Sequence, residues 1–518
     1  ALIAISLVAC TGSQNYPNDR VSINSLFPGD SRMWEHIFNV DGGYTFESAP
    51  FGVILPHHMI AAGQLAKFYS GLSKVINPSV VVIIGPNHYE NGEPNIQTCE
   101  KCVYKTTKGD VELDDELIEK MVEDGVADVL DETFVKEHAI YTHAPFIKNF
   151  FPEASIVPIV LQWEMPQDEV LELSEWLDKN LPSDALVLAS VDFSHYVPVE
   201  AADFHDVSAF RTISNFDFEN VYDLEIDSPS SIYAILSLME KHGYKKAERL
   251  EHTNLAQFLS KPEESTTSHQ FFAFYKGEPE GTRGVTMMVT GNIEMDNNVL
   301  SVDKGWNWDR NYDWGDDETV GKFLRDIKGS EDRFLVGSDF LLFDLGEADC
   351  MEESQNGLKV AFCKVEEGDD LEKSLKKIRD AGKNADLVYL QLDFGQINEE
   401  KKNLARIFVD AGADIVVGKG RHSPEPLEIY KDGLIFNSLG GFISYDSWAG
   451  MILGINATAD NYEIYIFPID VKSGYPKLMP LKKREAFFAE FIEEILKGNE
   501  LTDEIQIDYV KRVVKIQR

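Results

Sequence analysis

The stretch VVIIGPNHY, residues 81–89, decides how the first half of this chain folds. Four β-branched residues run without interruption into Gly85 and Pro86, which predicts a strand buried on both faces that ends in a turn. The first polar side chains after this turn belong to Asn87 and His88. A buried strand whose turn carries an imidazole indicates a scaffold that presents a histidine to a site.

The same arrangement occurs at two other places. GVILPHH (52–58) leads to His57. ALVLASVDFSHY (185–196) leads to Asp192 and His195. Ligands of open parallel α/β sheets bind beyond the carboxyl ends of the strands, so we expect these side chains to share one cleft. Imidazole binds metals and carries protons near neutral pH, which favours a metal or acid–base site over three merely hydrogen-bonded polar residues.

Strand-like runs alternate with amphipathic helical patterns between residues 52 and 275. The strand-like runs are GVILP, VVIIGP, SIVPIVL and ALVLAS, and the helical patterns include MIAAGQLAKFYSGL and DEVLELSEWLDKNL. This alternation predicts a parallel sheet covered by helices on both faces. A turn-rich seam at 275–284 leads to a second such pattern, which includes LKVAFCKV, DLVYLQLDFG and DIVVGKG. The predicted fold class is therefore α/β, in two α/β domains.

The charge balance limits the classes of partner. The 518 residues include 48 Lys and Arg against 88 Asp and Glu, a net charge of −40. Nucleic acids and anionic membrane surfaces attract basic faces, so we expect neither as a partner. A solvated, self-repelling surface accounts for the acidity better than an acidic binding tract does.

The first residues, ALIAISLVACTGSQN, have the short apolar run and small-residue exit of a signal peptide. Leu7-Val8-Ala9-Cys10 resembles the bacterial lipobox, whose cysteine is lipidated, and an ordinary signal peptide is the alternative. We assign residues 1–20 to this segment and expect an exported lipoprotein anchored at Cys10 on the extracytoplasmic face. In such a protein Cys99 and Cys102, which form CEKC, suit a local disulfide.

Five motifs in order resemble the Memo-like family, known in bacteria as AmmeMemoRadiSam system protein B. They are PHHMIAAG, IIGPNHY, EHAIYTHAPF (137–146), IVPIVL and SVDFSHY. The resemblance covers residues 48–276. It implies a fold similar to class III extradiol dioxygenases, which hold non-haem Fe(II) with two histidines and a glutamate.

The resemblance also implies a ligand set. The two metal histidines of the family fall on His57 and His88. Its third ligand is a cysteine, but this chain has LEIDSPSSIYAIL there, so Asp227 takes the position and Glu225 is a nearby alternative. Two histidines and a carboxylate suit iron (Fe²⁺) or copper, whereas loss of the cysteine is equally consistent with a weakened site.

Other pocket residues of the family match His143, Asp192 and His195. The resemblance implies that they orient a ligand or carry protons as general acid or base. His138 also fits its motif, with a structural role as the alternative.

Residues 284–470 resemble the capsule-biosynthesis protein CapA, a relative of calcineurin-like metallophosphatases. The departures fall on metal ligands: Asn292 replaces an aspartate, Asp393-Phe394-Gly395 replaces H-W-G, and Lys419 replaces the first histidine of G-H-x-x-H, leaving His422. A two-metal site needs several carboxylates and imidazoles together, so we expect a catalytically inactive scaffold.

These observations divide the chain into a Memo-like domain at 48–276, a CapA-like domain at 284–480 and a charged helical tail at 481–518. Two functions remain. One is a metal-dependent, oxygenase-like enzyme, and the other is a non-catalytic surface lipoprotein that binds a small-molecule or protein ligand through both domains. The second would keep its fold and function without metal.

Overall fold

The computed structural model describes residues 21–24, 31–40, 42–163, 165–259, 265–289, 292–293, 350–393, 398–419, 423–443, 449–472, 475–498, 505–509 and 511–517. The signal segment predicted at 1–20, with Cys10, lies outside these residues, as do Phe394, Gly395 and His422. In the described ranges, every helix is too short or too polar to cross a membrane.

The described residues form two compact units. The first holds those up to Asp192 together with Ser230–Glu251 and Phe271–Glu278, and the second holds Phe193–Pro229, His252–Gln270 and those from Pro279 onward. The domain boundaries predicted above follow family resemblance rather than compactness, and they stay a prediction.

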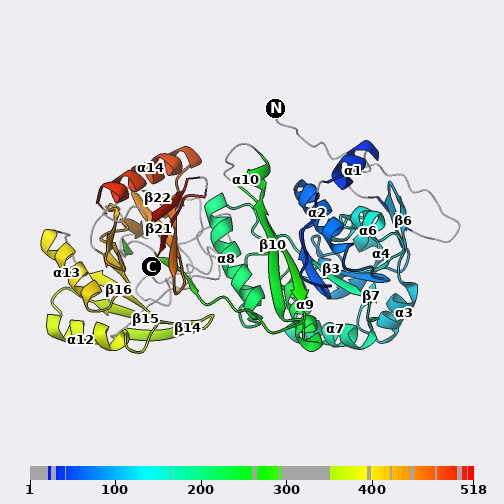
Figure 1. Ribbon diagram of the computed structural model, residues 1–518, viewed down its shortest axis with the longest axis horizontal. Coiled ribbons are helices and arrows are strands. Elements are labelled where there is room, and N and C mark those ends of the chain that lie inside the picture. Colours follow the sequence, from blue (N-terminus) through cyan, green and yellow to red (C-terminus); the bar gives the residue numbers. More distant parts are fainter. Residues whose placement is uncertain are drawn as a thin grey trace. The chain divides into compact units, whose positions relative to one another are not determined.

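An eight-stranded mixed sheet forms the centre of the first unit, in the order β10-β11-β2-β9-β3-β8-β4-β7 (Figure 1). The strands are β2 (Gly52–Leu55), β3 (Val80–Pro86), β4 (Ile96–Thr98), β7 (Asp128–Val129), β8 (Ser155–Leu161), β9 (Leu186–Ser190), β10 (Lys246–Asn254) and β11 (Ser268–Tyr275). The four central strands, β2, β9, β3 and β8, run parallel. All seven residues of β3 are buried, which is why its sequence is a continuous apolar run rather than an alternation.

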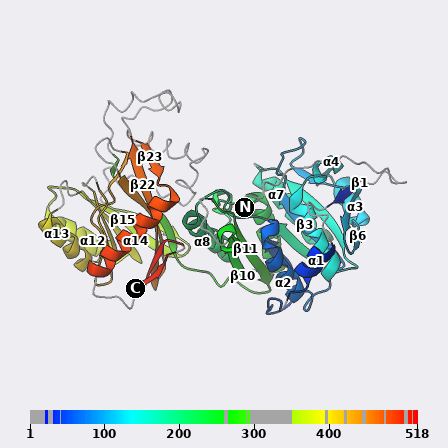
Figure 2. The same cartoon turned by 90° about the horizontal axis from the view of Figure 1, so that it is seen from above.

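Helices cover both faces of this sheet (Figures 1 and 2). On one side α2 (Ala62–Leu72) meets α6 (Ala144–Phe150), where the Tyr69 ring stacks on Phe146 at 5.5 Å. On the other side α7 (Gln167–Asn180) is joined to α9 (Pro229–His242) by the Ser174 hydroxyl, which donates to the carbonyl of Ala234. The α/β class predicted from the sequence is confirmed, but the sheet is mixed rather than parallel throughout, because β11 pairs with β2 and β4 pairs with β8 in antiparallel fashion.

The remaining elements of the first unit are short. They are β1 (Val21–Asn24), α1 (Ser31–Phe38), η1 (Met59–Ala61), β5 (Cys102–Thr106), β6 (Gly109–Val111), α3 (Asp115–Glu123), α4 (Asp131–Phe134) and α5 (His138–Tyr141). Strands β1, β5 and β6 form a small separate sheet. A disulfide joins Cys99 to Cys102, the first residue of the middle strand β5, a bond that the CEKC motif makes plausible.

Two sheets dominate the second unit. The first has the order β14-β15-β16-β17-β19-β18 and the second has β12-β21-β22-β25-β24, with β23 paired to β22. Their strands are β12 (Val285–Val289), β14 (Cys350–Gln355), β15 (Leu358–Val365), β16 (Leu387–Asp393), β17 (Ile415–Lys419), β18 (Leu427–Tyr430), β19 (Gly433–Phe436), β21 (Ala449–Ala457), β22 (Asn461–Lys472), β23 (Tyr475–Leu478), β24 (Ile505–Asp508) and β25 (Val513–Gln517). The strand pair β13 (Asn292–Ile293) and β20 (Gly441–Ile443) stands apart.

Alternating side chains of β15 separate two cores. Ala361 and Cys363 face α12 (Leu371–Ala381) and α13 (Glu399–Asp410), whereas Val360 and Phe362 pack towards the second sheet and α14 (Leu481–Gly498). This period of two is what a strand buried between two layers requires. The tail predicted to be helical at 481–518 begins with the helix α14. The described residues after this helix form β24 and β25, which extend the second sheet.

The other face of the second sheet contacts α8 (Val199–Asn215), whose Phe204 ring lies 5.3 Å from Tyr465. Two further elements are η2 (Val221–Asp223) and α10 (Leu255–Phe258). A disulfide between Cys350 and Cys363 links β14 to β15.

One buried carboxylate on α8 holds two buried guanidinium groups. Glu200 lies 2.9 Å from Nε of Arg484, and its other oxygen accepts a hydrogen bond from Arg512. All three side chains are at most 2% exposed. Since a buried charge without its partner is costly, this cluster fixes α8 to α14 and to the turn before β25.

Gly85 tests how tightly β3 packs on α5. A Cβ atom there would lie 2.9 Å from the Cβ of Ala139, so Gly85→Ala should lower the free energy of unfolding by about 1–3 kcal/mol. Gly63→Ala is the control, because a Cβ at this position on α2 meets nothing within 4 Å. Urea denaturation followed by tryptophan fluorescence measures both, and equal stabilities would contradict the packing described.

Removing the charge of Glu200 should destabilise the second unit. Glu200→Gln leaves two buried guanidinium groups without a carboxylate, and we expect a loss of about 3–5 kcal/mol. Glu490→Gln, at an exposed position of α14, should change stability by no more than about 0.5 kcal/mol. Urea midpoints that are the same for both variants would show that the buried cluster contributes nothing.

Candidate metal site at the carboxyl edge of the sheet

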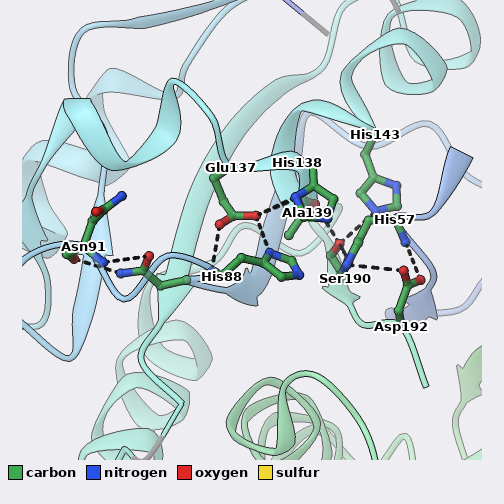
Figure 3. A network of polar contacts seen from close by, with 10 residues as sticks. His57, His88, Asn91, Glu137, His138, Ala139, His143, Ser190 and Asp192 are labelled. Carbon is green, nitrogen blue, oxygen red and sulfur yellow. Dashed lines mark hydrogen bonds and ion pairs between the residues drawn. The ribbon is translucent and has the colours of Figure 1, made fainter. Parts of the chain in front are cut away.

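Three imidazoles converge in the first unit (Figure 3). His57 follows β2, His88 follows β3 and His138 opens α5. Each offers a ring nitrogen, and these nitrogens lie within 4.8 Å of one another. The ring centroids of His57 are 5.0 Å from those of His88 and His138, which are themselves 4.1 Å apart. The arrangement is that of side chains gathered around a common point.

The sheet explains why His57 and His88 meet. Strands β2 and β3 both pair with β9 in parallel, so their carboxyl ends lie at the same edge. His138 reaches this edge from α5, which packs against β3 where Gly85 leaves room for Ala139. The His57 side chain is fully buried, but that of His88 is 22% exposed. The cluster is therefore anchored inside and open on one side.

Glu137 orients His88. This fully buried carboxylate accepts hydrogen bonds from the backbone nitrogen of His88 (3.0 Å), from its Nδ1 (2.7 Å) and from the backbone of Ala139 (2.9 Å). A second imidazole nitrogen, Nδ1 of His138, lies 3.6 Å away. Because Nδ1 of His88 carries the proton that it donates, its Nε2 keeps a lone pair, the form in which histidine binds a metal.

Asp192 and Ser190 hold His57. One oxygen of Asp192 accepts from the backbone nitrogen of His57 at 3.1 Å, and the other lies 3.5 Å from its Nε2. Nδ1 of His57 lies 3.0 Å from the Ser190 hydroxyl. Figure 3 shows both residues beside the ring of His57, so its backbone and its side chain are fixed together.

His143 contacts the same Ser190 hydroxyl as His57 and is fully buried. Its Nδ1 is 3.1 Å from the Tyr69 hydroxyl, and its Nε2 is 3.1 Å from the Ser190 hydroxyl. Burial, together with the nearby His57, lowers the pKa of His143 to about 3, although Asp192 acts in the opposite direction. A neutral ring with both nitrogens engaged suits holding neighbours in place, and its predicted role as general acid or base stays a prediction.

The structure thus gathers His57, His88, His143 and Asp192 in the first unit. Two other predicted residues belong to the second unit, where their suggested roles stay predictions. His195 is half-buried, with its ring 5.8 Å from that of Tyr196. Asp227 is buried, and its alternative Glu225 is half-buried.

Sequence reasoning misses several contributors. It does not single out Glu137 or Ser190, and it gives His138 a structural role as the alternative to a functional one. One signal is present, because Glu137 directly precedes His138 where a helix begins, and a carboxylate next to a histidine often orients metal ligands. Nothing in the sequence reveals that Ser190 contacts two histidines.

This donor set fits a divalent metal ion. Imidazole nitrogens beside a carboxylate suit iron, copper or zinc, and an exposed side leaves room for a further ligand.

The predicted loss of metallophosphatase ligands concerns the second unit, where Asn292, Asp393 and Lys419 are described only through their backbone. The loss of the metallophosphatase ligands therefore rests on the sequence.

Two family models match this chain. Residues 31–269 match the model of Memo-like proteins, and residues 296–446 match that of the bacterial capsule synthesis protein PGA_cap. The recognition of both resemblances from sequence motifs is confirmed.

Similar relatives are archaeal proteins named as MEMO1 family members. One from Caldivirga maquilingensis is 31% identical over 237 residues, which are 43% of this chain and 83% of the relative. Another from Pyrobaculum aerophilum is 30% identical over 238 residues, with the same shares.

Two solved structures are weakly similar to this chain. A hypothetical protein from Thermus thermophilus has a TM-score of 0.22 at 14% identity, covering 37% of this chain and 96% of its own. An uncharacterized protein from Escherichia coli has a TM-score of 0.29 at 12% identity, covering 42% and 98%. Such scores carry no argument about fold or function.

The buried His143 should make stability depend on pH. Its folded pKa of about 3 lies below the ordinary value, so the unfolded chain takes up a proton first and stability falls as pH decreases from about 6.5 to 3. Between pH 7 and pH 4 the wild type should lose roughly 3 kcal/mol more than His143→Gln, which cannot titrate. Urea unfolding of metal-free protein measures this difference.

His36→Gln, at an exposed position, is the control and should lose as much stability as the wild type. If His143→Gln also follows the wild-type pH dependence, the ring of His143 is not kept neutral by burial.

Proposed function

Since this chain belongs to the Memo-like protein family, we propose that its N-terminal domain is a metal-binding domain with a dioxygenase-like pocket and a fold similar to class III extradiol dioxygenases. His57, His88 and His138 would hold a divalent ion, iron (Fe²⁺) or copper. The single observation behind this proposal is the convergence of three ring nitrogens within 4.8 Å, beside two carboxylates that fix the rings.

Electrostatics favour a shared cation at this point. Two positive charges on rings about 5 Å apart repel each other by about 3 kcal/mol at an effective dielectric constant of 20. Protonating more than one of these imidazoles to the imidazolium form is therefore unfavourable, whereas neutral rings can direct one lone pair each at a single shared ion. Glu137 and Asp192 supply the compensating negative charge.

A bound Fe²⁺ would supply redox or Lewis-acid chemistry at this site. The residues of the chain would orient the ligands of this ion. Glu137 orients His88, and Asp192 with Ser190 orients His57. The exposed side next to His88 is where a small-molecule ligand would approach. His195 remains the proposed proton carrier, and Asp227 the proposed carboxylate ligand in place of the family's cysteine.

The location proposed for the protein is outside the cytoplasm. Cys99–Cys102 and Cys350–Cys363 are both disulfides, and such bonds persist in oxidising compartments. This observation supports export, and the proposed anchor to the membrane through Cys10 on the extracytoplasmic face rests on the lipobox-like sequence Leu7-Val8-Ala9-Cys10.

A second candidate function is that of a non-catalytic surface lipoprotein. The observation in its favour is the loss of metallophosphatase ligands at Asn292, Lys419 and the former H-W-G motif. On this proposal the CapA-like domain is an inactive scaffold that binds a small-molecule or protein ligand, and the Memo-like domain does the same without metal.

Metal content distinguishes the two functions. Protein purified without oxygen and reconstituted with Fe²⁺ should hold about one iron per chain by ICP-MS, because three imidazoles converge on one point. The His57→Ala/His88→Ala variant should hold none, and His138→Ala should hold less than the wild type.

The matched control is His242→Ala, which removes a half-buried histidine paired with Asp178 away from the cluster and should keep its iron. Wild-type protein that holds neither iron nor copper after reconstitution would refute the metal proposal and leave the binding function.

A further inference from the structure

Ser190 is the last residue of β9, the strand between β2 and β3. Its side chain is fully buried and has three polar neighbours. The hydroxyl donates to the carbonyl of Ala139 at 2.7 Å and lies 3.0 Å from Nδ1 of His57 and 3.1 Å from Nε2 of His143 (Figure 3). One hydroxyl therefore connects both histidines to α5.

Counting protons fixes the direction of these bonds. A serine hydroxyl has one proton to donate and two lone pairs to accept with. The carbonyl of Ala139 only accepts, so the serine proton goes there. Both imidazoles must then donate to the hydroxyl, which places a proton on Nδ1 of His57 and one on Nε2 of His143.

The contact of Tyr69 with the opposite ring nitrogen of His143 is consistent with this proton assignment. With Nε2 of His143 protonated, its Nδ1 is an acceptor, and the Tyr69 hydroxyl lies 3.1 Å away to donate to it. The chain of bonds runs from Tyr69 through His143 to Ser190 and ends on the Ala139 carbonyl. Every donor in it meets an acceptor, as buried polar groups require.

We propose that Ser190 is a positioning residue that holds His57 and His143 in opposite tautomers, so that the lone pair of His57 Nε2 is directed at the metal. The inference rests on the metal site proposed above and adds the residue that prepares it. In proteins the tautomer of a metal-binding histidine is set by the hydrogen bond of its other nitrogen, and Ser190 makes that bond here.

Packing keeps the hydroxyl in place. A Cβ atom at Gly85 would lie 3.4 Å from the Cβ of Ser190 and 2.9 Å from that of Ala139, so β3, β9 and α5 approach one another closely. The serine side chain has little space to rotate away from its partners. The site is therefore organised before a metal arrives, which lowers the cost of binding.

The test compares Ser190→Ala with Ser174→Ala. Ser174 is an equally buried serine of the first unit, whose hydroxyl lies 2.9 Å from the carbonyl oxygen of Val170 and 3.1 Å from that of Ala234 and, among the described residues, makes no hydrogen bond to a histidine. Co²⁺ serves as a spectroscopic substitute for Fe²⁺, and its affinity is measured by competition with a chelator. Ser190→Ala should bind Co²⁺ about 10–100-fold more weakly, and Ser174→Ala should match the wild type.

Solid-state ¹⁵N NMR of histidine-labelled, metal-free protein reads the tautomers directly. Spectra of His57→Ala and His143→Ala identify the two residues. The wild type should show a protonated Nδ1 for His57 and a protonated Nε2 for His143, and Ser190→Ala should lose this pattern. A wild-type His57 that carries its proton on Nε2 would overturn the inference without reference to any variant.

The outcomes separate this inference from the metal proposal. If the wild type binds Co²⁺ and Ser190→Ala binds it equally with unchanged tautomers, Ser190 has no positioning role although the metal site stands. If the wild type binds no metal, the proposed function fails. The NMR spectra of the metal-free protein then decide the role of Ser190 alone.

Discussion

The parallel pairing of β2, β9 and β3 is the constraint on which the candidate site depends. It brings three strand ends to one edge, and each end carries a polar residue: His57, His88 and the pair Ser190 and Asp192. Because the strands are buried on both faces, their register is specified by packing, and the positions of these residues follow from it. A small residue at Gly85 then allows α5 to add Glu137 and His138 from the side.

The hydrogen bonds around the site show how a buried sheet edge tolerates so many polar groups. Glu137 accepts three bonds, and Ser190 uses its full capacity. Such saturated networks are rigid, since displacing one member leaves another buried and unpaired. The second unit applies the same rule at a different place, where Glu200 on α8 offsets the buried charges of Arg484 and Arg512.

Much of the fold could be predicted because apolar runs and amphipathic periodicity are local features of the sequence that indicate strands and helices. The apolar run before His88 is a buried parallel strand, and the helical stretches between the runs cover the sheet. Part of the site could be predicted for the same reason, since His57, His88 and Asp192 each follow a strand. Glu137 and Ser190 could not, because their partners are 49 and 133 residues away in sequence and no local period connects them.

The sequence by itself determined the two family resemblances, the strand-end histidines and the absence of the family's cysteine, since all three are matters of residue type and order. Only the tertiary structure decided which side chains meet. It placed His138 beside His57 and His88, made His143 a buried neutral neighbour of Ser190, and paired Cys350 with Cys363. The physical reason is that contacts between distant residues depend on strand order and on how closely helices approach the sheet, and neither is encoded in any one segment.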